Sequence, residues 1–511
     1  MACASEPSSN ENTETDEKGD SSSSNDLIVA TSRDLVSLDP AGSNDTPSSN
    51  AQENIYERLV KLNADMEIEA SLATEWEAVE EDVWEFTLRE GVKFHDGSDF
   101  NAEVVKANIE RVLDEKVASP RAFLYTMVED IEVVDDYTVR FKTEFPFAPL
   151  PAHLAHHGGG MVSLELIEED YKAMENGEEP GSVINKNPIG TGFLKYDEWK
   201  PDKHIKFVKN EDYWGDEAKV DTVTFKVVSE DQTRIAELMT GDAHIAEPIS
   251  PTDVAQVENE DGLFVNRQGS ARLSYIGFHM GKEPFDDPKV RKAIRMAIDK
   301  EQIIDGIYDG NGIPAVGPLA PNVFGYDESV PGVEYDPEKA KDLLKEAGFE
   351  DGFKTTLWTH DEREQVDTAT NVQAQLKEIG IDAEVEVLEW GAYLDQTAKG
   401  EHDMFILGWS TVTGDADYGL YALLHSDNFG STGNRTFTEN EELDKLLEEA
   451  RQNPDPKERQ KLYSEIQGLL NEISPMIYIH HEEYLLGVSE KVTGLEQDAT
   501  ATLLLQNVEI E

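Results

Sequence analysis

Apolar and polar positions in the first part of the chain predict a mixed α+β structure. Residues 84–88 alternate with the period of two that is typical of a half-buried strand, and turn residues follow at Gly91. Asn101 then precedes a run, 102–113, whose apolar residues share one helical face. A second hairpin is predicted over 131–141.

From Val220 onward the pattern changes to strands that alternate with helices. Residues 223–228 are predicted to form a buried strand, 231–240 a helix that ends at Gly241, and 243–246 the next strand. Similar signals predict helices after Asp287-Pro288 and Asp336-Pro337, a helix over 366–379, and strands at 355–358, 383–388 and 403–407. Such alternation predicts a mostly parallel sheet, with ligands bound at the carboxyl ends of its strands. The last strand-like pieces, 476–480 and 485–488, are predicted to return to an earlier lobe.

The stretch 408–418 is the most informative candidate for a binding loop. It follows the predicted strand 403–407 and precedes a helix-like run, and loops at strand ends commonly carry function. It combines an indole, hydroxyls, two carboxylates and glycines, which suits recognition of a small polar molecule. The candidate ligand-binding residues are Trp409, Ser410, Thr411, Asp415, Asp417 and Tyr418.

Length and charge narrow the class of protein. A chain of 511 residues exceeds what one hydrophobic core supports, so two or three lobes are expected. Because 106 acidic residues oppose 44 basic ones, the net charge is −62, and such a surface repels nucleic acid phosphates and anionic lipid headgroups. Nucleic acid is therefore excluded as a partner. The acidic residues are spread evenly, which we interpret as adaptation to saline surroundings.

Cys3 is the single cysteine, so a disulfide framework or a thiolate metal cluster within the chain is excluded. Residues 4–25 are rich in Ser, Asn, Asp and Glu without apolar periodicity, which is typical of a disordered tether. A cysteine followed by such a tether resembles the start of a mature bacterial lipoprotein, in which the cysteine carries the lipid anchor. An accidental cysteine in an unstructured tail is the alternative.

Several blocks carry a family resemblance that covers the chain from about Asp26 to its end. They lie, in this order, at 38–40, 56–59, 89–97, 187–192, 210–214 and 284–294. Together they resemble the family 5 extracellular solute-binding proteins, the receptors of peptide, glutathione and nickel ABC importers. The resemblance implies an α/β, two-lobed periplasmic-binding-protein-like fold of type II, with an extra subdomain in the first lobe.

The resemblance also implies an order of domains along the chain. Residues 1–25 are expected to form the lipoprotein tether and 26–265 the first lobe, including a subdomain at about 56–190. Residues 266–480 form the second lobe, and 481–511 return to the first. Such a receptor closes around its ligand and needs neither a catalytic group nor a cofactor. It is expected to act as a monomer on the outer face of the bacterial cytoplasmic membrane and to deliver its ligand to a permease.

The identity of the ligand depends on a few positions. Dipeptide receptors of this family hold the ligand amine with an aspartate after the Gly-Trp pair, and Val412 stands at that position here. The amine then needs Asp415 or Asp417, and the loop is more similar to that of glutathione-binding members. Arg363, within a residue of the family's carboxylate-binding arginine, and Arg272 are candidates for a ligand carboxylate. Arg121 is a weaker third candidate, and an exposed arginine among acidic neighbours is the alternative interpretation of Arg363.

Two alternative functions are considered beside that of a receptor for a peptide or glutathione. A nickel-chelate receptor of the same family is one alternative, although its arginine should fall near His156 and His157, where none is present. No metal is expected at these histidines and His153, because no partnering carboxylate or cysteine pattern follows. A hydrolase using Asp415 and Asp417 is the alternative from a different class. The run 190–192 lacks the lysine of a phosphate loop and predicts a close approach of backbones.

Overall fold

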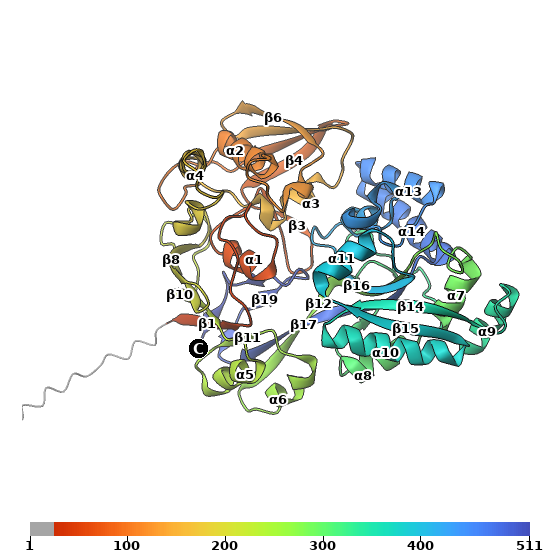
Figure 1. Cartoon of the computed structure of the whole chain (residues 1–511). Coiled ribbons are helices and arrows are strands. Elements are labelled where there is room, and N and C mark those ends of the chain that lie inside the picture. Colours follow the sequence, from red (N-terminus) through yellow and green to blue (C-terminus); the bar gives the residue numbers. More distant parts are fainter. Residues whose placement is uncertain (1–24) are drawn as a thin grey trace, which may run out of the picture.

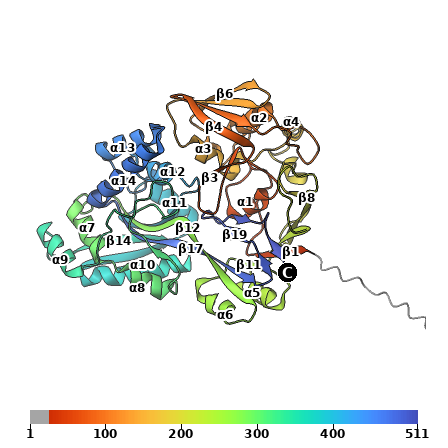
Figure 2. The same cartoon turned by 180° about the vertical axis from the view of Figure 1, so that it is seen from behind.

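The computed structural model describes residues 25–511 as two lobes, with a further β-rich part above the first (Figure 1). Cys3 and the predicted tether up to residue 24 lie outside the described residues. Figure 2, seen from behind, places the C-terminus beside β1 (Asp26–Thr31), so the two ends of the described chain meet in the same lobe. No helix of the described part is long and apolar enough to cross a membrane.

One large mixed sheet runs through both lobes. Its strands follow the order β15 (Ile381–Leu388), β14 (Phe353–His360), β16 (Met404–Ser410), β12 (Leu263–Phe278), β17 (Met476–Ser489), β11 (Ile245–Glu247), β1, β10 (Thr222–Val227), β9 (His204–Lys209) and β8 (Leu194–Lys200), and β13 (Ile313–Pro314) pairs with β17. β14 pairs in parallel with β15 and β16, and β1 pairs in parallel with β10 and β11. The central pairs are antiparallel. The prediction of a mostly parallel sheet is therefore wrong, because the chain crosses between the lobes on two strands of opposite direction.

Those two strands, β12 and β17, are the connection between the lobes. They pair from Leu263 opposite Ser489 to Gly277 opposite Met476, with a register shift between Gly269 and Leu273. The two short pieces predicted at 476–480 and 485–488 are one strand of 14 residues. The predicted lobe boundaries at 265/266 and 480/481 fall inside these strands.

The first lobe contains the shorter half of the sheet and the last part of the chain. Leu27 and Val29 of β1 pack with Val223 of β10 and with Leu503 and Val508 near the C-terminus. Around this core lie α1 (Thr46–Glu53), α5 (Asp231–Thr240), α6 (Val254–Glu258), β18 (Val492–Thr493), β19 (Glu496–Gln497), β20 (Leu503–Leu504) and β21 (Glu509–Ile510). α5 ends at Gly241 with φ +79°, as predicted, because glycine adopts this left-handed conformation without strain.

A four-stranded antiparallel sheet forms the core of the β-rich part. Its order is β4 (Ala73–Glu80), β5 (Val83–Leu88), β7 (Thr138–Thr143) and β6 (Val128–Asp135), and its helices are α2 (Ala102–Leu113), α3 (Leu150–Leu154) and α4 (Leu164–Glu175). Asn101 caps α2 by accepting a hydrogen bond from Val104 N at 3.2 Å, as its position predicts. The strand predicted at 84–88 is β5, which forms a hairpin with β4 before it and not across the turn at Gly91, and the hairpin predicted over 131–141 is that of β6 and β7.

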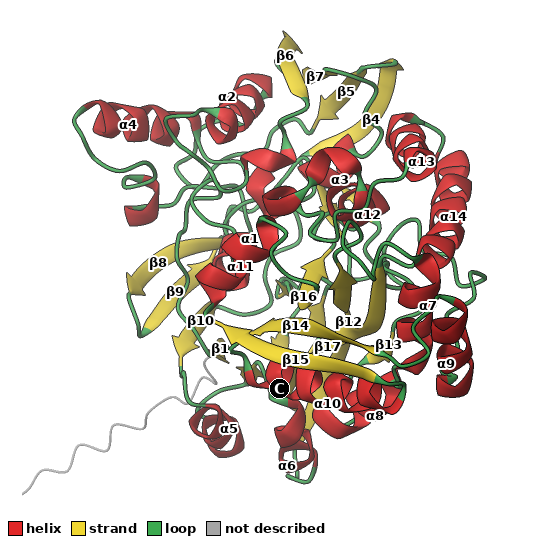
Figure 3. Ribbon diagram, turned by 45° about the vertical axis from the view of Figure 1, so that its right-hand side comes forward, coloured by secondary structure: helices red, strands yellow, loops and turns green. Residues whose placement is uncertain are grey.

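Helices cover both faces of the sheet in the second lobe (Figure 3). α10 (Arg363–Glu378) packs Val372 and Leu376 against Leu357 of β14 and Ile381 of β15. The other helices are α7 (Pro288–Ala297), α8 (Lys300–Ile307), α9 (Pro337–Glu346), α11 (Trp390–Ala398), α12 (Ala416–Leu424), α13 (Glu441–Gln452) and α14 (Pro456–Ile473). Asp287 and Asp336 cap α7 and α9, as the Asp-Pro pairs predict.

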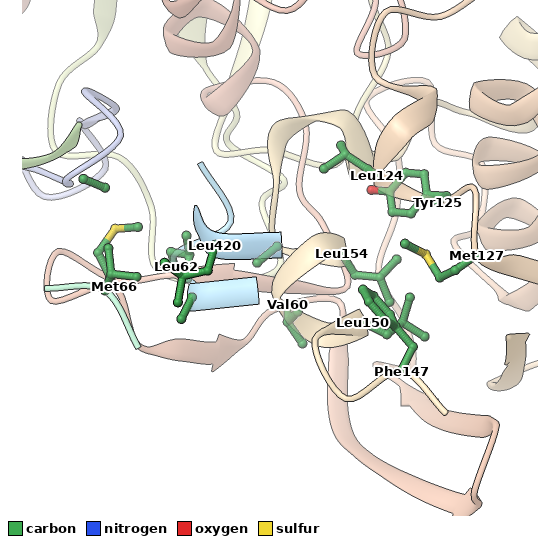
Figure 4. Close-up of a cluster of buried hydrophobic side chains, with 14 of the residues drawn as sticks. Val60, Leu62, Met66, Leu124, Tyr125, Met127, Phe147, Leu150, Leu154 and Leu420 are labelled. Atoms are coloured by element: carbon green, nitrogen blue, oxygen red, sulfur yellow. The ribbon is translucent and has the colours of Figure 1, made fainter. Parts of the chain in front are cut away.

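Apolar side chains also join the first lobe to the second. The hairpin of β2 (Val60–Leu62) and β3 (Ile68–Ala70) carries Leu62 and Met66, and Leu420 of α12 lies beside them (Figure 4). The buried cluster continues on one side into the β-rich part and on the other into α13 and α14. The lobes therefore touch here as well as along β12 and β17.

Candidate functional site

Two adjoining cavities lie along β17, one of the two strands that connect the lobes. The smaller, of about 200 Å³, is lined by residues that follow β1 and by α1. The larger, of about 470 Å³, has first-lobe residues on one side and Tyr308, Glu362, Gln365 and His480 of the second lobe on the other. Both include Glu247, Pro248, Tyr484 and Ala501 in their walls, and we call them together the interlobe cleft. Its size suits a small ligand, since such sites typically measure about 300 to 1,000 Å³.

Acidic side chains dominate the walls of the interlobe cleft. Two of the lining residues are arginines, Arg33 and Arg234, whereas the carboxylates are those of Asp34, Asp231, Glu247, Glu362, Glu364, Glu482 and Glu483. A cleft lined by one sign of charge concentrates ligands of the opposite sign. The cleft therefore favours a ligand with at least one cationic group.

Arg272 lies inside β12, at the register shift. Its Nε donates a hydrogen bond to Glu482 Oε1 at 2.7 Å, and this carboxylate raises the pKa of the Arg272 guanidinium. Glu482 lines the interlobe cleft, so Arg272 stands directly behind the cleft wall. A ligand carboxylate at this position has to compete with Glu482.

Arg363 is the first residue of α10, which begins three residues before the predicted helix 366–379. Its side chain is 82% exposed, and Asp367 Oδ2 lies 3.7 Å from its Nε. Glu362 and Glu364, on either side of it in the sequence, line the interlobe cleft, whereas Arg363 itself is not among the lining residues. Arg121, in contrast, is fully buried and donates to Gln52 Oε1 and Ser49 Oγ within the first lobe.

The stretch 408–418 is only partly a loop. Gly408 to Ser410 belong to β16, where Leu273 of β12 lies opposite Trp409 and Arg272 opposite Ser410. Thr411 is buried and donates its backbone N–H to Ala271 O at 3.0 Å. α12 then begins at Ala416, so the loop proper is confined to 411–415.

Trp409 and Tyr418 form an aromatic stack next to a third cavity. Their ring centroids are 5.3 Å apart, and Tyr418 lies 5.6 Å from the ring of Phe123 in the first lobe. The three rings, with His153 and Asp417, line a cavity of about 660 Å³ between the β-rich part and the second lobe. Trp409 thus walls a space between lobes, but a different one from the interlobe cleft.

Asp415 and Asp417 are each held by an arginine. Arg459 donates to both carboxylate oxygens of Asp415 at 2.9 and 2.7 Å, and Arg451 donates to both oxygens of Asp417 at 3.1 Å. All four side chains are largely buried. These pairs tie the end of the loop to α14 and the start of α12 to α13. A ligand amine or a hydrolytic water would have to compete with a bidentate guanidinium, which is a strong partner.

Glu247 is a cleft residue that sequence reasoning missed. It ends β11 and accepts a hydrogen bond from Asn50 Nδ2 at 3.2 Å. Burial raises the pKa of Glu247 to about 7, against the opposing effects of the Asn50 hydrogen bond and the Arg234 charge. Its position after the predicted strand 243–246, at the carboxyl end of a parallel strand, is the signal that could have found it.

The histidines considered for metal binding have separate partners. His153 Nδ1 lies 2.8 Å from Leu124 O, His157 Nε2 lies 3.1 Å from Glu53 Oε2, and His156 Nδ1 accepts from Gly158 N. Within residues 25–511, no three His, Cys, Asp or Glu side chains are grouped so as to hold a metal ion. The close approach predicted at 190–192 is present, because a Cβ on Gly190 would overlap the carbonyl oxygen of Ile55.

Two lobes joined by a pair of crossing strands, with a cleft between them, define the class of two-lobed solute-binding proteins. The family model of the bacterial extracellular solute-binding proteins, family 5, matches residues 67–431, and the chain belongs to this family.

Relatives and solved structures agree with this assignment. The glutathione-binding protein GsiB of Salmonella typhi is 34% identical over 478 residues, which cover 92% of this chain and 91% of that protein. HbpA2 from Haemophilus parasuis superposes with a TM-score of 0.87 at 28% identity, covering 95% of this chain and 100% of that one. The periplasmic binding protein DppA from Helicobacter pylori, solved with the peptide STSA, gives a TM-score of 0.78 at 33% identity, with coverages of 95% and 98%.

Proposed function

We propose that this protein is the receptor of an ABC importer and captures a peptide-like solute, either glutathione or a short peptide, in the interlobe cleft. The observation that carries the proposal is a cavity of about 470 Å³ that is walled by both lobes and runs along β17, one of the strands that connect them. A ligand that contacts both walls favours the closed form, and a permease can recognise that shape. The names of the relatives at about one-third identity support glutathione or peptide as the solute.

The remaining parts of the proposal concern compartment and assembly. We assign residues 1–25 to a tether, 26–265 and 481–511 to the first lobe with the subdomain at about 56–190, and 266–480 to the second lobe. Cys3 is the proposed site of a lipid anchor that holds the receptor on the outer face of the cytoplasmic membrane. The receptor acts as a monomer and needs no cofactor.

The alternatives have less support from the described residues. A hydrolase using Asp415 and Asp417 is disfavoured, because each carboxylate is already held by a guanidinium. A nickel-chelate receptor needs a cationic group to bind the chelator's carboxylate, and at the expected place the ring of His157 pairs with Glu53. A peptide-like solute with its own cationic group suits the acidic cleft better.

Isothermal titration calorimetry across ligand classes tests the proposal. Glutathione, dipeptides, longer peptides and nickel–histidine mixtures are titrated separately, and the ligand is recovered and identified by mass spectrometry. Glutathione or a short peptide is expected to bind saturably and to be recovered intact. If no peptide-like ligand binds, the proposed function is wrong, and conversion of the ligand to a product would indicate an enzyme.

A further inference from the structure

We propose that Glu247 binds a cationic group of the ligand, an ammonium or a guanidinium, on the first-lobe side of the interlobe cleft. The inference rests on the proposed function and assigns the recognition of charge to a residue outside the stretch 408–418. It replaces Asp415 and Asp417 as the partner of a ligand amine.

The position of Glu247 fits this role. It ends β11 and lines both cavities of the interlobe cleft, so a ligand in either one can reach it. Asn50 Oδ1 accepts a hydrogen bond from Leu503 N at 2.9 Å, which turns the amide so that its Nδ2 donates to Glu247 Oε1. Glu247 Oε2 has no hydrogen-bond donor within the part of the chain that the structure describes, and it is available to a ligand.

Within residues 25–511 Glu247 has no cationic partner, in contrast to two other carboxylates of the interlobe cleft. Glu482 is paired with Arg272 at 2.7 Å, and Asp231 is paired with Arg234 at 2.7 Å. The Arg234 guanidinium donates its other hydrogen bonds to Val228 O and Pro248 O, and not to Glu247. Because a poorly hydrated carboxylate without a counterion is unfavourable, Glu247 gains most from a cation that the ligand supplies.

The position at which family members hold an amine has no room for one here. Val412 borders a space of about 10 Å³, which suffices for about one water molecule. Arg58, which is paired with Glu53, and Asp498 line the same space, so its charges are already balanced without a ligand. The amine therefore has to bind elsewhere.

A second side chain of the interlobe cleft, that of His480, also has hydrogen-bonding atoms to which a ligand can bind. His480 is fully buried and lines the larger cavity from the second lobe. Neither of its ring nitrogens has a hydrogen-bond partner among residues 25–511, and its ring lies 4.4 Å from that of Tyr308. Burial lowers the pKa of His480, so the ring is neutral at pH 7 and can hydrogen-bond a polar group of the ligand without repelling its cation.

A thermodynamic cycle tests the role of Glu247. Glutathione and alanyl-alanine, each with its N-acetyl derivative, are titrated into the wild type, Glu247→Gln and Glu247→Asp by calorimetry. Glu260→Gln is the matched control, since it removes the same charge from an exposed first-lobe site outside the cleft. Thermal melts verify that each variant is folded.

For the ligand that binds, we expect Glu247→Gln to weaken affinity about 10- to 100-fold, Glu247→Asp to weaken it less, and Glu260→Gln to leave it unchanged. The N-acetyl derivative should bind the wild type and Glu247→Gln equally weakly. Equal affinity of the wild type and Glu247→Gln for the free amine overturns the inference but leaves the proposed function intact. The inference is also overturned if Glu247→Gln loses as much affinity for the N-acetylated ligand as for the ligand with a free amine. If neither glutathione nor alanyl-alanine binds the wild type, the cycle is repeated with the peptide that binds in the calorimetric series, and failure of every peptide in that series contradicts the proposed function itself.

Discussion

Arg459 and Asp415 form a bidentate ion pair in which both side chains are buried, with N···O distances of 2.9 and 2.7 Å. Asp415 also caps α12 by accepting a hydrogen bond from Asp417 N at 2.9 Å. The pair fixes the end of the loop 411–415 to α14. Asp415 therefore has a structural role that explains its presence without a ligand.

This role predicts a large loss of stability when one partner is removed. Asp415→Ala leaves the Arg459 guanidinium buried and unpaired, and we expect the free energy of unfolding to fall by about 3 to 5 kcal/mol. The double variant Asp415→Ala/Arg459→Met should be more stable than Asp415→Ala alone, because it removes the unpaired charge. Chemical denaturation measures both values, and a loss below about 1 kcal/mol in Asp415→Ala would contradict the structural role.

Glu247 should lower the stability of the unliganded protein at alkaline pH. Because burial raises its pKa from 4.5 to about 7, the folded state holds this proton more tightly than the unfolded state. The stability that Glu247 contributes is present below pH 4.5 and is lost as the pH rises to 7. We expect Glu247→Gln to exceed the wild type by about 1 to 3 kcal/mol at pH 8 and by much less at pH 5.

The charged groups around Glu247 are the same in the wild type and in Glu247→Gln. Their own titration therefore contributes equally to the two free energies of unfolding and cancels from the difference between them. These groups are Arg234 on α5, Arg33 and Asp34 after β1, and the phenol of Tyr484 on β17. Urea unfolding at the two pH values gives the comparison. A difference that is equal at pH 5 and pH 8 would show that the Glu247 carboxyl does not titrate in this range.

The helix starts and turns could be predicted from the sequence because their signals are local. Asp287 and Asp336 each accept a backbone N–H within three residues, and Gly241 ends its helix by its own conformation. The full length of β17 could not be predicted in this way. Glu482 and Glu483, which line the cleft, interrupt the apolar pattern of this strand. Strand partners depend on residues far apart in the chain.

The candidate site was predicted less completely, because its contacts also join residues that are far apart in the chain. The arginines that hold Asp415 and Asp417 lie 44 and 34 residues further along the chain. Glu247 is oriented through Asn50, which precedes it by 197 residues, and Asn50 in turn is fixed by Leu503. No pattern of spacing identifies such a set of contacts.

Salt should stabilise the fold as a whole. With a net charge of −62, repulsion between acidic side chains opposes compaction, and the Debye length falls to about 3 Å at 1 M salt. We expect the melting temperature to rise steadily between dilute and molar sodium chloride. A flat or falling melting temperature would refute the interpretation of the charge as an adaptation to saline surroundings.

Arg272 and Arg363 remain the predicted partners of a ligand carboxylate. Arg272→Met should weaken binding of a ligand with a free carboxylate about 10-fold, and Arg363→Ala somewhat less, because Arg363 is highly exposed. Arg267→Met is the matched control, since it also lies in β12 but pairs with Glu258 outside the cleft. Calorimetry with the ligand and its C-terminal amide tests this prediction, which is wrong if both forms lose affinity equally.

The lipid anchor predicts a change of compartment. In a bacterial host the native precursor should partition into detergent, whereas Cys3→Ser should be released in soluble form. Fractionation and immunoblotting distinguish the two. Equal membrane retention of Cys3→Ser would contradict the lipoprotein assignment.

The most direct test of the central claim is a crystal structure of the protein with the glutathione or short peptide that binds in calorimetry. We predict that the ligand lies in the interlobe cleft, between the walls that contain Glu247 and His480, with its cationic group about 3 Å from the Glu247 carboxylate. A ligand bound only in the cavity beside Trp409, or outside both lobes, would contradict the claim.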